Sequence, residues 1–471
     1  MELPFNFIAF FLFLAFVLCL IKEWKRSKAA QKFPPSPLKL PVIGNMHHLV
    51  GSPPHHALRK LARQHGALMH LQLGEISSIV VSSPHLAKEI MKTHDLAFAD
   101  RAEFLTSKIL MYNSSDIACC PYGDYWRQMR KICTLELLSA KNVRSFGSIR
   151  QDEASHLVAS VQALAAAGKL VNISEKLYSY TSSMVCRAAF GKILHPLLSV
   201  KSQLVKIHLK MDKLLGNIID QHIDNLARTN MATGESGNED LIDVLLRVKE
   251  SGDLQFPIAN NNIKAIVIDV FSAGTETSST TVEWAMSEMV RNPNVMAKAQ
   301  SEIRTAFKGK KKIEETDIQE LKYLKLVIKE TLRLHPPVPL LVPRECREEC
   351  EIEGYTIPVK TRVLVNAWAI GRDPEYWDDP ESFKPDRFKT NPVDFTGTHF
   401  EYLPFGAGRR MCPGISFGLA NVDLPLALLL YHFNWKLPNG LDPCDLDMSE
   451  TVGITASRKD SLRLLATSYD P

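Results

Sequence analysis

The sequence predicts a mainly α-helical domain with a minor β-sheet, preceded by an N-terminal transmembrane helix. Three observations predict this class: an apolar stretch without charge opens the chain, helical periodicity dominates from about residue 86 to residue 335, and short strand-like runs flank that helical part. The chain has 471 residues, and neither an internal repeat nor a Gly/Ser-rich linker divides it. We therefore expect one large domain after the N-terminal segment.

The N-terminal segment has the length and the charge order of a membrane anchor. Leu3 to Ile21 carries no charge, and at about 1.5 Å per residue it reaches roughly 28 Å, close to the hydrocarbon thickness of a bilayer. Basic residues follow it, which keeps the rest of the chain in the cytosol: Lys22, Lys25, Arg26, Lys28 and Lys32. A cleavable signal peptide would have its positive charges first and small residues at its end, and this segment has neither.

These patterns divide the chain into three parts. We predict an anchor at residues 1–22, a basic and proline-rich hinge at 23–38, and a catalytic domain at 39–471. The nine cysteines are an odd number scattered along the chain, which fits reduced thiols in the cytosol better than a disulfide framework. No long basic run follows residue 32, so we expect no nucleic-acid partner.

The domain is expected to begin with strands, and short strands return after its main helical part. Strands are predicted at Ile79–Val81, around Tyr355–Pro358 and at Val363–Val365, where short apolar runs meet turn residues. Helices are predicted where apolar residues recur at steps of three and four: Leu157–Ala167, Leu204–Leu226, Ile263–Val290, about Leu321–Leu334, and a buried helix from Ile415 to Phe433.

A cysteine in a glycine-rich loop is the most specific feature of the sequence. The segment Pro404-Phe-Gly-Ala-Gly-Arg-Arg-Met-Cys-Pro-Gly414 places Cys412 just before a long apolar helix. A helix N-terminus offers free N–H groups and a positive dipole end, and both favour a thiolate. A thiolate suits a haem iron that must cleave an O–O bond, and Arg410 is within reach of a haem propionate. An inert buried cysteine is the alternative interpretation of a lone cysteine.

Three further motifs precede or flank this loop. Ala273-Gly-Thr-Glu276-Thr277 lies inside the helical run from Ile263, where glycine costs stability, about 1 kcal/mol against alanine. Glu330-Thr-Leu-Arg333 places an acid and a base on one helical face, and Pro385-Asp-Arg387-Phe follows it. Trp126 and Arg130 are one helical turn apart. Alone, each motif would be read as helix packing or as a solvated ion pair.

Together these motifs resemble the cytochrome P450 superfamily. The spacing Phe-x-x-Gly-x-Arg-x-Cys-x-Gly is met at every fixed position, and the chain as a whole is similar to plant microsomal members that hydroxylate terpenoids and alkaloids. The resemblance implies haem b with Cys412 as the axial ligand of its iron, and a proton relay by Glu276 and Thr277. It implies further cofactor contacts at Trp126, Arg130, Arg344, Phe405, Gly406 and Arg410, a substrate pocket at Val270, Ala273, Val338, Leu341 and Ile454, and a structural network of Glu330, Arg333 and Arg387.

The same resemblance implies the setting of the enzyme. Its partners would be a membrane-bound NADPH–cytochrome P450 reductase and a small hydrophobic substrate. The protein would be a single-pass protein of the endoplasmic reticulum membrane, with the catalytic domain in the cytosol. A terpenoid is the favoured substrate, and an alkaloid or another hydrophobic compound is the alternative.

One departure from the family concerns the helices that roof the substrate pocket. Between Phe190-Gly191 and Glu239-Asp240 the family has two helices and a mobile loop, whereas this sequence shows one helical pattern, about Leu197 to Arg228. We predict a shortened lid with a gap near residues 191–205. Haem binding should survive this loss, and a haem-binding but catalytically impaired protein is an alternative outcome.

Two other functions compete with a monooxygenase. A haem-thiolate isomerase or dehydratase would rearrange a peroxide without electrons, but that class typically lacks the acid–alcohol pair found here as Glu276-Thr277. A haem protein that only binds a ligand is the second alternative. Two histidine pairs, His47-His48 and His55-His56, lie in a turn-rich segment, and we expect them to be solvated.

Overall fold

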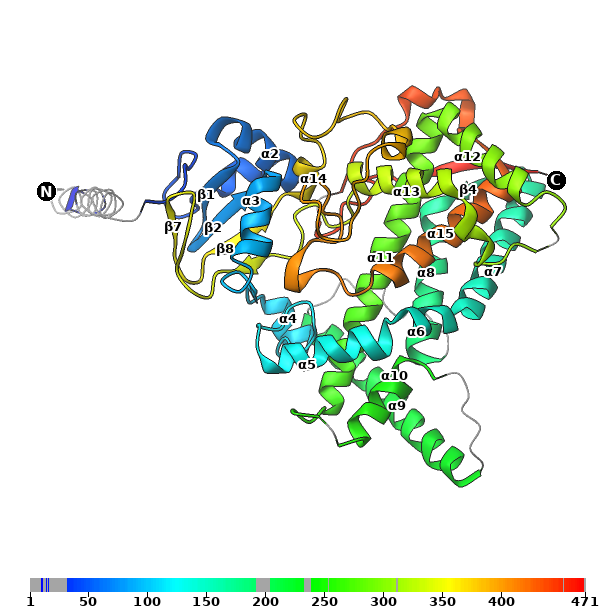
Figure 1. The fold of residues 1–471 in the computed structure, drawn as a ribbon, viewed down its shortest axis with the longest axis horizontal. Helices are drawn as coiled ribbons and strands as arrows, with labels where there is room; N and C mark the ends of the chain where they lie inside the picture. The colour runs from blue at the N-terminus through cyan, green and yellow to red at the C-terminus, as the bar shows by residue number, and fades with distance from the viewer. Residues whose placement is uncertain are drawn as a thin grey trace, which may run out of the picture.

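The computed structural model describes residues 32–191, 204–232, 239–252, 254–310, 312–451 and 453–469, together with four positions of the N-terminal segment. The predicted anchor and most of the predicted hinge therefore lie outside the described residues. Figure 1 shows a part rich in strands at one end of the molecule and a larger helical part at the other. The predicted class, mainly helical with minor sheets, is confirmed.

The strand-rich part is built around one five-stranded sheet. Its order is β1-β2-β8-β5-β3, so strands from both ends of the catalytic domain lie side by side. The strands are β1 (Leu68–Leu73), β2 (Ile76–Val81), β3 (Asp100–Arg101), β5 (Arg344–Glu345) and β8 (Arg362–Val365). β1 and β2 form an antiparallel hairpin, while β2 and β8 run parallel. The parallel pair joins the start of the domain to its last third, and helix α2 (Pro54–His65) packs on this sheet.

The helical part surrounds one long central helix, α11 (Asn260–Arg291), which packs against α8 and α15. Most of its C-terminal half is buried. The other helices are α3 (Pro84–Lys88), α4 (Leu105–Leu110), α5 (Asp124–Ile132), α6 (Ala140–Ser145), α7 (Gly147–Ala166), α8 (Ile173–Phe190), α9 (Leu204–Ala232), α10 (Leu241–Glu250), α12 (Pro293–Ala306), α13 (Lys322–Leu334), α14 (Ala367–Ile370) and α15 (Ile415–His432).

Helix α15 is apolar enough to span a membrane by length and composition, yet it is a core helix of the domain. Residues from Val422 to Tyr431 pack against α7, α12 and α13, so the apolar run is explained by burial. The sequence prediction of a buried helix here is confirmed. Because Cys412 lies just before this rigid element, its position is fixed by the packed core.

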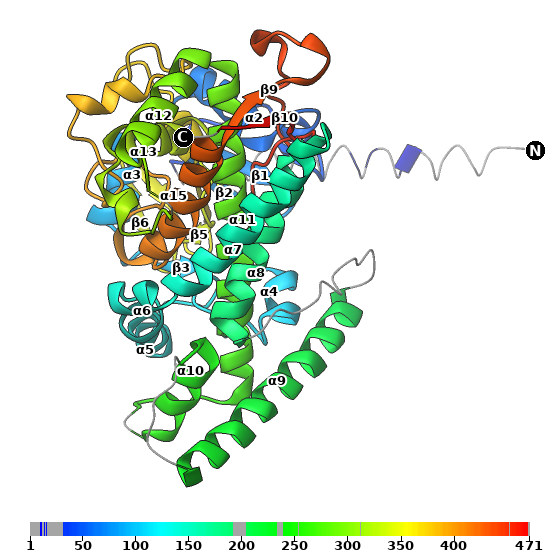
Figure 2. The same cartoon turned by 90° about the vertical axis from the view of Figure 1, so that its right-hand side faces the viewer.

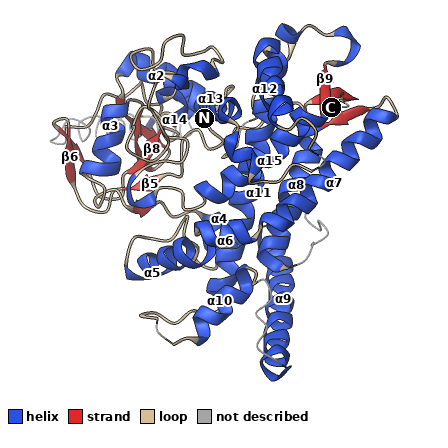
Figure 3. Ribbon diagram, turned by 45° about the vertical axis from the view of Figure 1, so that its right-hand side comes forward, coloured by secondary structure: helices blue, strands red, loops and turns tan. Residues whose placement is uncertain are grey.

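Two smaller sheets complete the fold, and Figure 3 shows strands gathered at two separated places. A three-stranded sheet, ordered β4-β10-β9, joins β4 (Leu170–Asn172), β10 (Arg463–Ser468) and β9 (Phe433–Lys436). A hairpin pairs β6 (Cys350–Ile352) with β7 (Tyr355–Ile357). The sequence predicted β7 and β8, whereas the strands near the C-terminus went unpredicted because their pairing partners are distant in the chain.

Helices α9 and α10 project from the base of the helical part (Figure 2). The helical pattern predicted from about Leu197 begins at Leu204 among the described residues and continues to Ala232. Residues 192–203, where we predicted the shortening, lie outside the described residues. The flanking ends meet: a Cβ on Gly191, at the end of α8, would lie 2.8 Å from Asp240 Oδ2, at the start of α10. The end of α8 and the start of α10 therefore lie side by side, and α9 lies between them in the chain.

Candidate functional site

A cavity lies between α11 and the cysteine loop, and most of the residues singled out from the sequence line it. These are Trp126, Arg130, Val270, Ala273, Thr277, Val338, Leu341, Arg344, Phe405, Gly406, Arg410 and Cys412. They come from α5, α11, the segment after α13, β5 and the loop before α15. Residues separated by nearly 300 positions in the chain thus share one wall.

The cysteine loop is held by its own backbone. The Cys412 N–H donates to the carbonyl of Phe405 at 3.0 Å, and the Gly406 N–H donates to Leu403 at 3.1 Å. Gly408 has φ +70°, and a Cβ there would lie 2.0 Å from the carbonyl oxygen of Met91. Only glycine therefore fits where the loop crosses the segment after α3.

The Cys412 thiol is open to the cavity, while protein encloses it on the remaining sides. Burial raises the pKa of this thiol, and the backbone N–H of Gly414 and the charge of Arg130 act in the opposite direction. The helix start favours the thiolate, as expected, but desolvation of the sulfur outweighs those two interactions.

One wall of the cavity is strongly cationic. Arg410 donates to the carbonyls of Ala99 (2.7 Å) and Cys120 (2.6 Å), and its guanidinium lies 4.3 Å from the ring centroid of Trp126. Burial lowers the pKa of Arg410 to about 10, and repulsion from Arg344 adds to this effect. The side chain is thus packed and oriented by neutral groups, which leave its charge uncompensated.

Arg344 and Arg101 extend the same wall. Arg344 donates to the Ala407 carbonyl at 2.8 Å and pairs with Asp95 at 3.2 Å. Arg101 was not singled out from the sequence; it is buried and donates to the carbonyls of Ala118 (2.9 Å) and Val342 (2.5 Å). Burial lowers the pKa of Arg101, with further repulsion from Arg344.

The charges of the cavity wall do not balance. Its lining residues include four arginines and a single carboxyl group, that of Asp269 on α11. Asp269 accepts from the N–H groups of Ile117 and Ala118, each at 3.2 Å. Burial and the neighbouring Asp116 raise the pKa of Asp269 to about 7. An apolar cavity with excess buried guanidinium groups and an open thiol fits an anionic, metal-containing ligand.

Helix α11 presents Thr277 but not Glu276 to this cavity. The Thr277 hydroxyl donates to the Ala273 carbonyl one turn earlier at 2.5 Å. Glu276 is exposed and is absent from the wall, because adjacent residues of a helix point about 100° apart.

Gly274 lies where α11 meets two neighbouring helices, at the edge of the cavity. A Cβ on Gly274 would lie 3.3 Å from the ring of Phe417 and 3.4 Å from Val185. The missing side chain therefore lets α11 pack closely against α8 and α15, although the glycine backbone borders the cavity.

The predicted substrate residues separate into two groups. Val270, Ala273, Val338 and Leu341 line the cavity, and Leu341 has φ +53°, a strained conformation for a leucine. Ile454 is not on the wall. It lies in the loop closed by the bridge between Glu450 and Arg458, where 84% of its surface is exposed.

The three residues of the predicted structural network meet behind the cysteine loop. Glu330 pairs with Arg333 at 2.8 Å and with Arg387 at 3.0 Å, and Glu330 and Arg333 are almost completely buried. Arg333 also donates to the carbonyls of Gly371 (2.6 Å) and Pro380 (2.7 Å). We call Glu330, Arg333 and Arg387 the Glu330 cluster; it connects α13 to the segment that leads into the cysteine loop.

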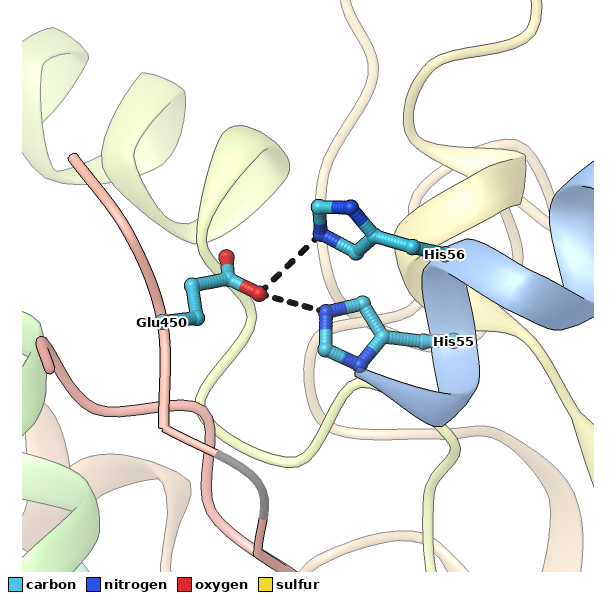
Figure 4. A group of neighbouring side chains, drawn as sticks. All are labelled: His55, His56 and Glu450. Carbon is cyan, nitrogen blue, oxygen red and sulfur yellow. Dashed lines mark hydrogen bonds and ion pairs between the residues drawn. The ribbon is translucent and has the colours of Figure 1, made fainter. Parts of the chain in front are cut away.

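The expectation for one histidine pair is wrong. His55 is buried in the first turn of α2, and both His55 and His56 lie within ion-pair distance of Glu450 (Figure 4). Their partner is 394 or more positions away, so no local pattern could reveal it. His47 and His48 instead contact backbone carbonyls nearby.

Comparisons with known proteins agree with this geometry. A sequence profile described as "Cytochrome P450" matches residues 34–198 and 193–463. The chain is 58% identical, over an alignment of 502 residues that covers 99% of both chains, to premnaspirodiene oxygenase of Hyoscyamus muticus. It is 55% identical to 5-epiaristolochene 1,3-dihydroxylase of Nicotiana tabacum (500 residues, 99% of both chains).

A third relative and a solved structure extend the comparison. Tabersonine 3-oxygenase of Catharanthus roseus is 53% identical over 504 residues, which cover 99% of this chain and 98% of the relative. A zebra fish cytochrome P450 solved with progesterone superposes with a TM-score of 0.77 and 26% identity, covering 88% of this chain and 99% of that one.

Proposed function

The chain belongs to the cytochrome P450 family, and from that premise we propose that this monooxygenase holds haem b through Cys412 and oxidises an apolar specialised metabolite, a terpenoid. The observation that carries the proposal is the position of Cys412. Its sulfur opens into an apolar cavity whose wall carries four arginines, three of them buried. A porphyrin with two carboxylates and an iron matches these donors in both charge and chemistry.

The arginines would hold the cofactor by its propionates. Arg130, Arg344 and Arg410 line the cavity and lack a full set of anionic partners. The ring of Trp126 packs against the Arg410 guanidinium. Backbone hydrogen bonds of Phe405 and Gly406 shape the loop around the Cys412 sulfur. Because burial opposes the Cys412 thiolate, a metal cation supplies the charge that keeps it deprotonated.

The bound haem supplies the reduction of dioxygen and the insertion of one oxygen atom into the substrate. The protein residues position the reactants and handle protons. Thr277 holds a hydroxyl proton at the cavity wall, and Glu276 lies one residue away on the exposed side of α11, where it can exchange protons with water. Val270, Ala273, Val338 and Leu341 form an apolar surface against the substrate.

The choice of a terpenoid rests on the relatives. Two of the relatives named above are a premnaspirodiene oxygenase and a 5-epiaristolochene dihydroxylase, and the third is a tabersonine 3-oxygenase. The apolar wall of the cavity supports a hydrocarbon skeleton and is equally compatible with the alternative, an alkaloid. A hydroxylated product is expected, with an epoxide as the second outcome.

The proposal includes a shortened lid. The two parts of the profile match overlap at residues 193–198, which lie within the predicted gap. Alignments with the relatives run to 504 positions although this chain has 471 residues, so they contain gaps in this chain. Helix α9 still packs against α4, α10 and α11, although none of its described residues lines the cavity.

The setting of the enzyme is also proposed from the family. Residues 1–22 would anchor it in the endoplasmic reticulum membrane, residues 23–38 would form the hinge, and residues 39–471 would form the cytosolic catalytic domain. Electrons would come from NADPH–cytochrome P450 reductase. The uncharged stretch from Leu3 to Ile21 and the basic residues after it support this arrangement.

Turnover in membranes that contain the reductase tests the function. Sesquiterpenes, other terpenes and indole alkaloids would be supplied in parallel, and NADPH use and oxygenated products would be measured together. NADPH-dependent product from a sesquiterpene is the expected result. Haem-loaded protein that oxidises no member of the panel would contradict the proposal, and conversion of alkaloids alone would replace the substrate class.

Thr277→Ala provides a second test within the same assay. Loss of the hydroxyl should increase the NADPH consumed per product, because proton delivery at the cavity wall would be impaired. Unchanged coupling would contradict the role of Thr277, and a product formed without NADPH would favour the isomerase alternative.

A further inference from the structure

A second cluster of titratable groups lies where the strand-rich part meets the C-terminal segment, outside the cavity. His55 Nε2 lies 2.6 Å and His56 Nε2 3.2 Å from the same oxygen, Oε2, of Glu450. Figure 4 shows both rings turned from α2 toward this carboxylate. His335 Nδ1 lies 3.9 Å from the other oxygen, Oε1. We call His55, His56, His335 and Glu450 the Glu450 cluster.

We propose that the Glu450 cluster binds a zinc ion that ties α2 to the C-terminal segment and to the end of α13. Three imidazole nitrogens and one carboxylate oxygen are a donor set that suits Zn²⁺, and four protein ligands are typical of a structural zinc site. The donor atoms of His55, His56 and Glu450 already lie within 4.8 Å of one another. Ligand atoms around tetrahedral zinc lie about 3.3 Å apart, given zinc–nitrogen distances near 2.0 Å.

His335 supplies the second, independent observation. Its side chain is 7% exposed, and its Nδ1 atom has no hydrogen-bond partner among the described residues. Nε2 of the same ring pairs with Glu288 Oε1 at 2.7 Å. A histidine held by a carboxylate at one nitrogen, with the other nitrogen free to bind, has the arrangement common to zinc ligands in proteins.

The rings of the cluster are fixed by packing before any ion binds. His335 stacks on Trp284 with a centroid distance of 4.0 Å and an interplanar angle of 6°, and His56 stacks on Trp368 at 4.2 Å. Such support reduces the side-chain entropy lost on binding. His56 has 42% of its side chain exposed, which leaves an entry path from solvent.

The local charge also favours a dication. Glu450 and Glu288 are both buried, and their ion-pair partners among the described residues are imidazoles. Two arginines lie nearby: Arg372 pairs with Glu381 at 3.1 Å, and Arg458 interacts with Glu288.

The binding test uses the full-length haem-loaded protein without a polyhistidine tag. The protein is treated with a chelator, its haem content is checked by absorbance, and it is titrated with zinc against a chromogenic competitor. We expect one equivalent of tightly held zinc, and X-ray absorption of the bound metal should show nitrogen and oxygen ligands without sulfur. Because the readout is metal content, failure here leaves the oxygenase proposal untouched.

Variants identify the ligands. His56→Ala and Glu450→Gln should each weaken zinc binding at least tenfold. Glu288→Gln removes only the support of His335 and should weaken it by about 10- to 100-fold. The matched controls are His47→Ala/His48→Ala, a second adjacent pair, and Cys444→Ser, an exposed thiol; both should bind zinc as the parent does.

Several outcomes would overturn the proposal. These are a chelator-treated protein that takes up no zinc, sulfur among the ligands, loss of the ion in Cys444→Ser, or unchanged affinity in His56→Ala. If zinc does not bind while His56→Ala alters the pH dependence of unfolding, the cluster is a proton-linked ion pair and the metal site is wrong.

Discussion

Two buried carboxylates of this protein, Glu330 and Glu450, have partners of different chemistry. Glu330 pairs with two guanidinium groups, which stay charged at every physiological pH. Glu450 faces three imidazoles, which change charge near neutral pH and can bind metals. Both clusters join distant parts of the chain, but only the second has the chemistry to respond to protons or metal ions.

The largest expected difference follows from neutralising each carboxylate. Glu330→Gln would leave Arg333 and Arg387 without their anion, and Arg333 is fully buried. We expect a loss of about 3–5 kcal/mol in the free energy of unfolding, the usual cost of breaking a buried pair. Denaturant unfolding of the haem-loaded protein measures it, and a loss below about 1 kcal/mol would contradict the structural role of the Glu330 cluster.

The matched change at Glu450 should cost less. Glu450→Gln leaves no guanidinium partner behind, so only hydrogen bonds to a charged acceptor are weakened. With a chelator present, we expect a loss of about 1–3 kcal/mol in the free energy of unfolding. A cost equal to that of Glu330→Gln would show that the histidines carry charge, and the comparison between the two clusters would fail.

The two clusters should also differ in pH dependence. Burial holds the pKa of His55 below its usual 6.5, so the unfolded chain binds a proton there more readily than the folded protein. The stability contributed by neutral His55 is therefore present above pH 6.5 and is lost as pH falls below it. Stability curves of parent and His55→Gln should differ most above pH 6.5 and approach each other as the pH falls below 6.5.

Two other buried groups titrate in the same pH range, so the effect of His55 must be taken as the difference between the parent and His55→Gln. Asp269 and Asp240, whose pKa values burial raises to about 7, release protons from the folded state in the same pH range and act with the opposite sign. The difference between parent and variant removes these contributions. Parallel curves for parent and His55→Gln would contradict the assignment.

The smallest effect is expected at the exposed neighbour of the Glu330 cluster. Asp386 precedes Arg387 but pairs at the surface with Lys298 at 2.7 Å. Because both side chains are nearly half exposed, we expect Asp386→Asn to change stability by less than about 1 kcal/mol in the same denaturant assay. A larger loss would mean that the network extends to the surface.

The sequence predicted what short motifs and periodicity encode. The loop around Cys412, the long helix α11 and the pairing of Glu330 with Arg333 depend on neighbours within one turn or one loop, and the structure places them as expected. Arg387 required the resemblance to a family, because it lies 57 positions from Glu330.

Long-range burial is where sequence reasoning failed. His55 looked solvated because its partner Glu450 is 395 positions away. Arg101 and Asp269 carry no local signal of the cavity that they line. The start of α15 favours the Cys412 thiolate as expected, but the desolvation that opposes it depends on walls that come from several separate segments. The shortening of the lid stays a prediction, because residues 192–203 lie outside the described residues.

The central claim is that Cys412 binds the iron of a haem through its sulfur. The most direct measurement is the absorbance spectrum of the reduced, carbon monoxide-treated protein, compared between the parent and Cys412→Ser. We predict the red-shifted Soret band of a thiolate-ligated haem in the parent and its absence in the variant. The same band in Cys412→Ser, or a parent that binds haem without it, would contradict the account.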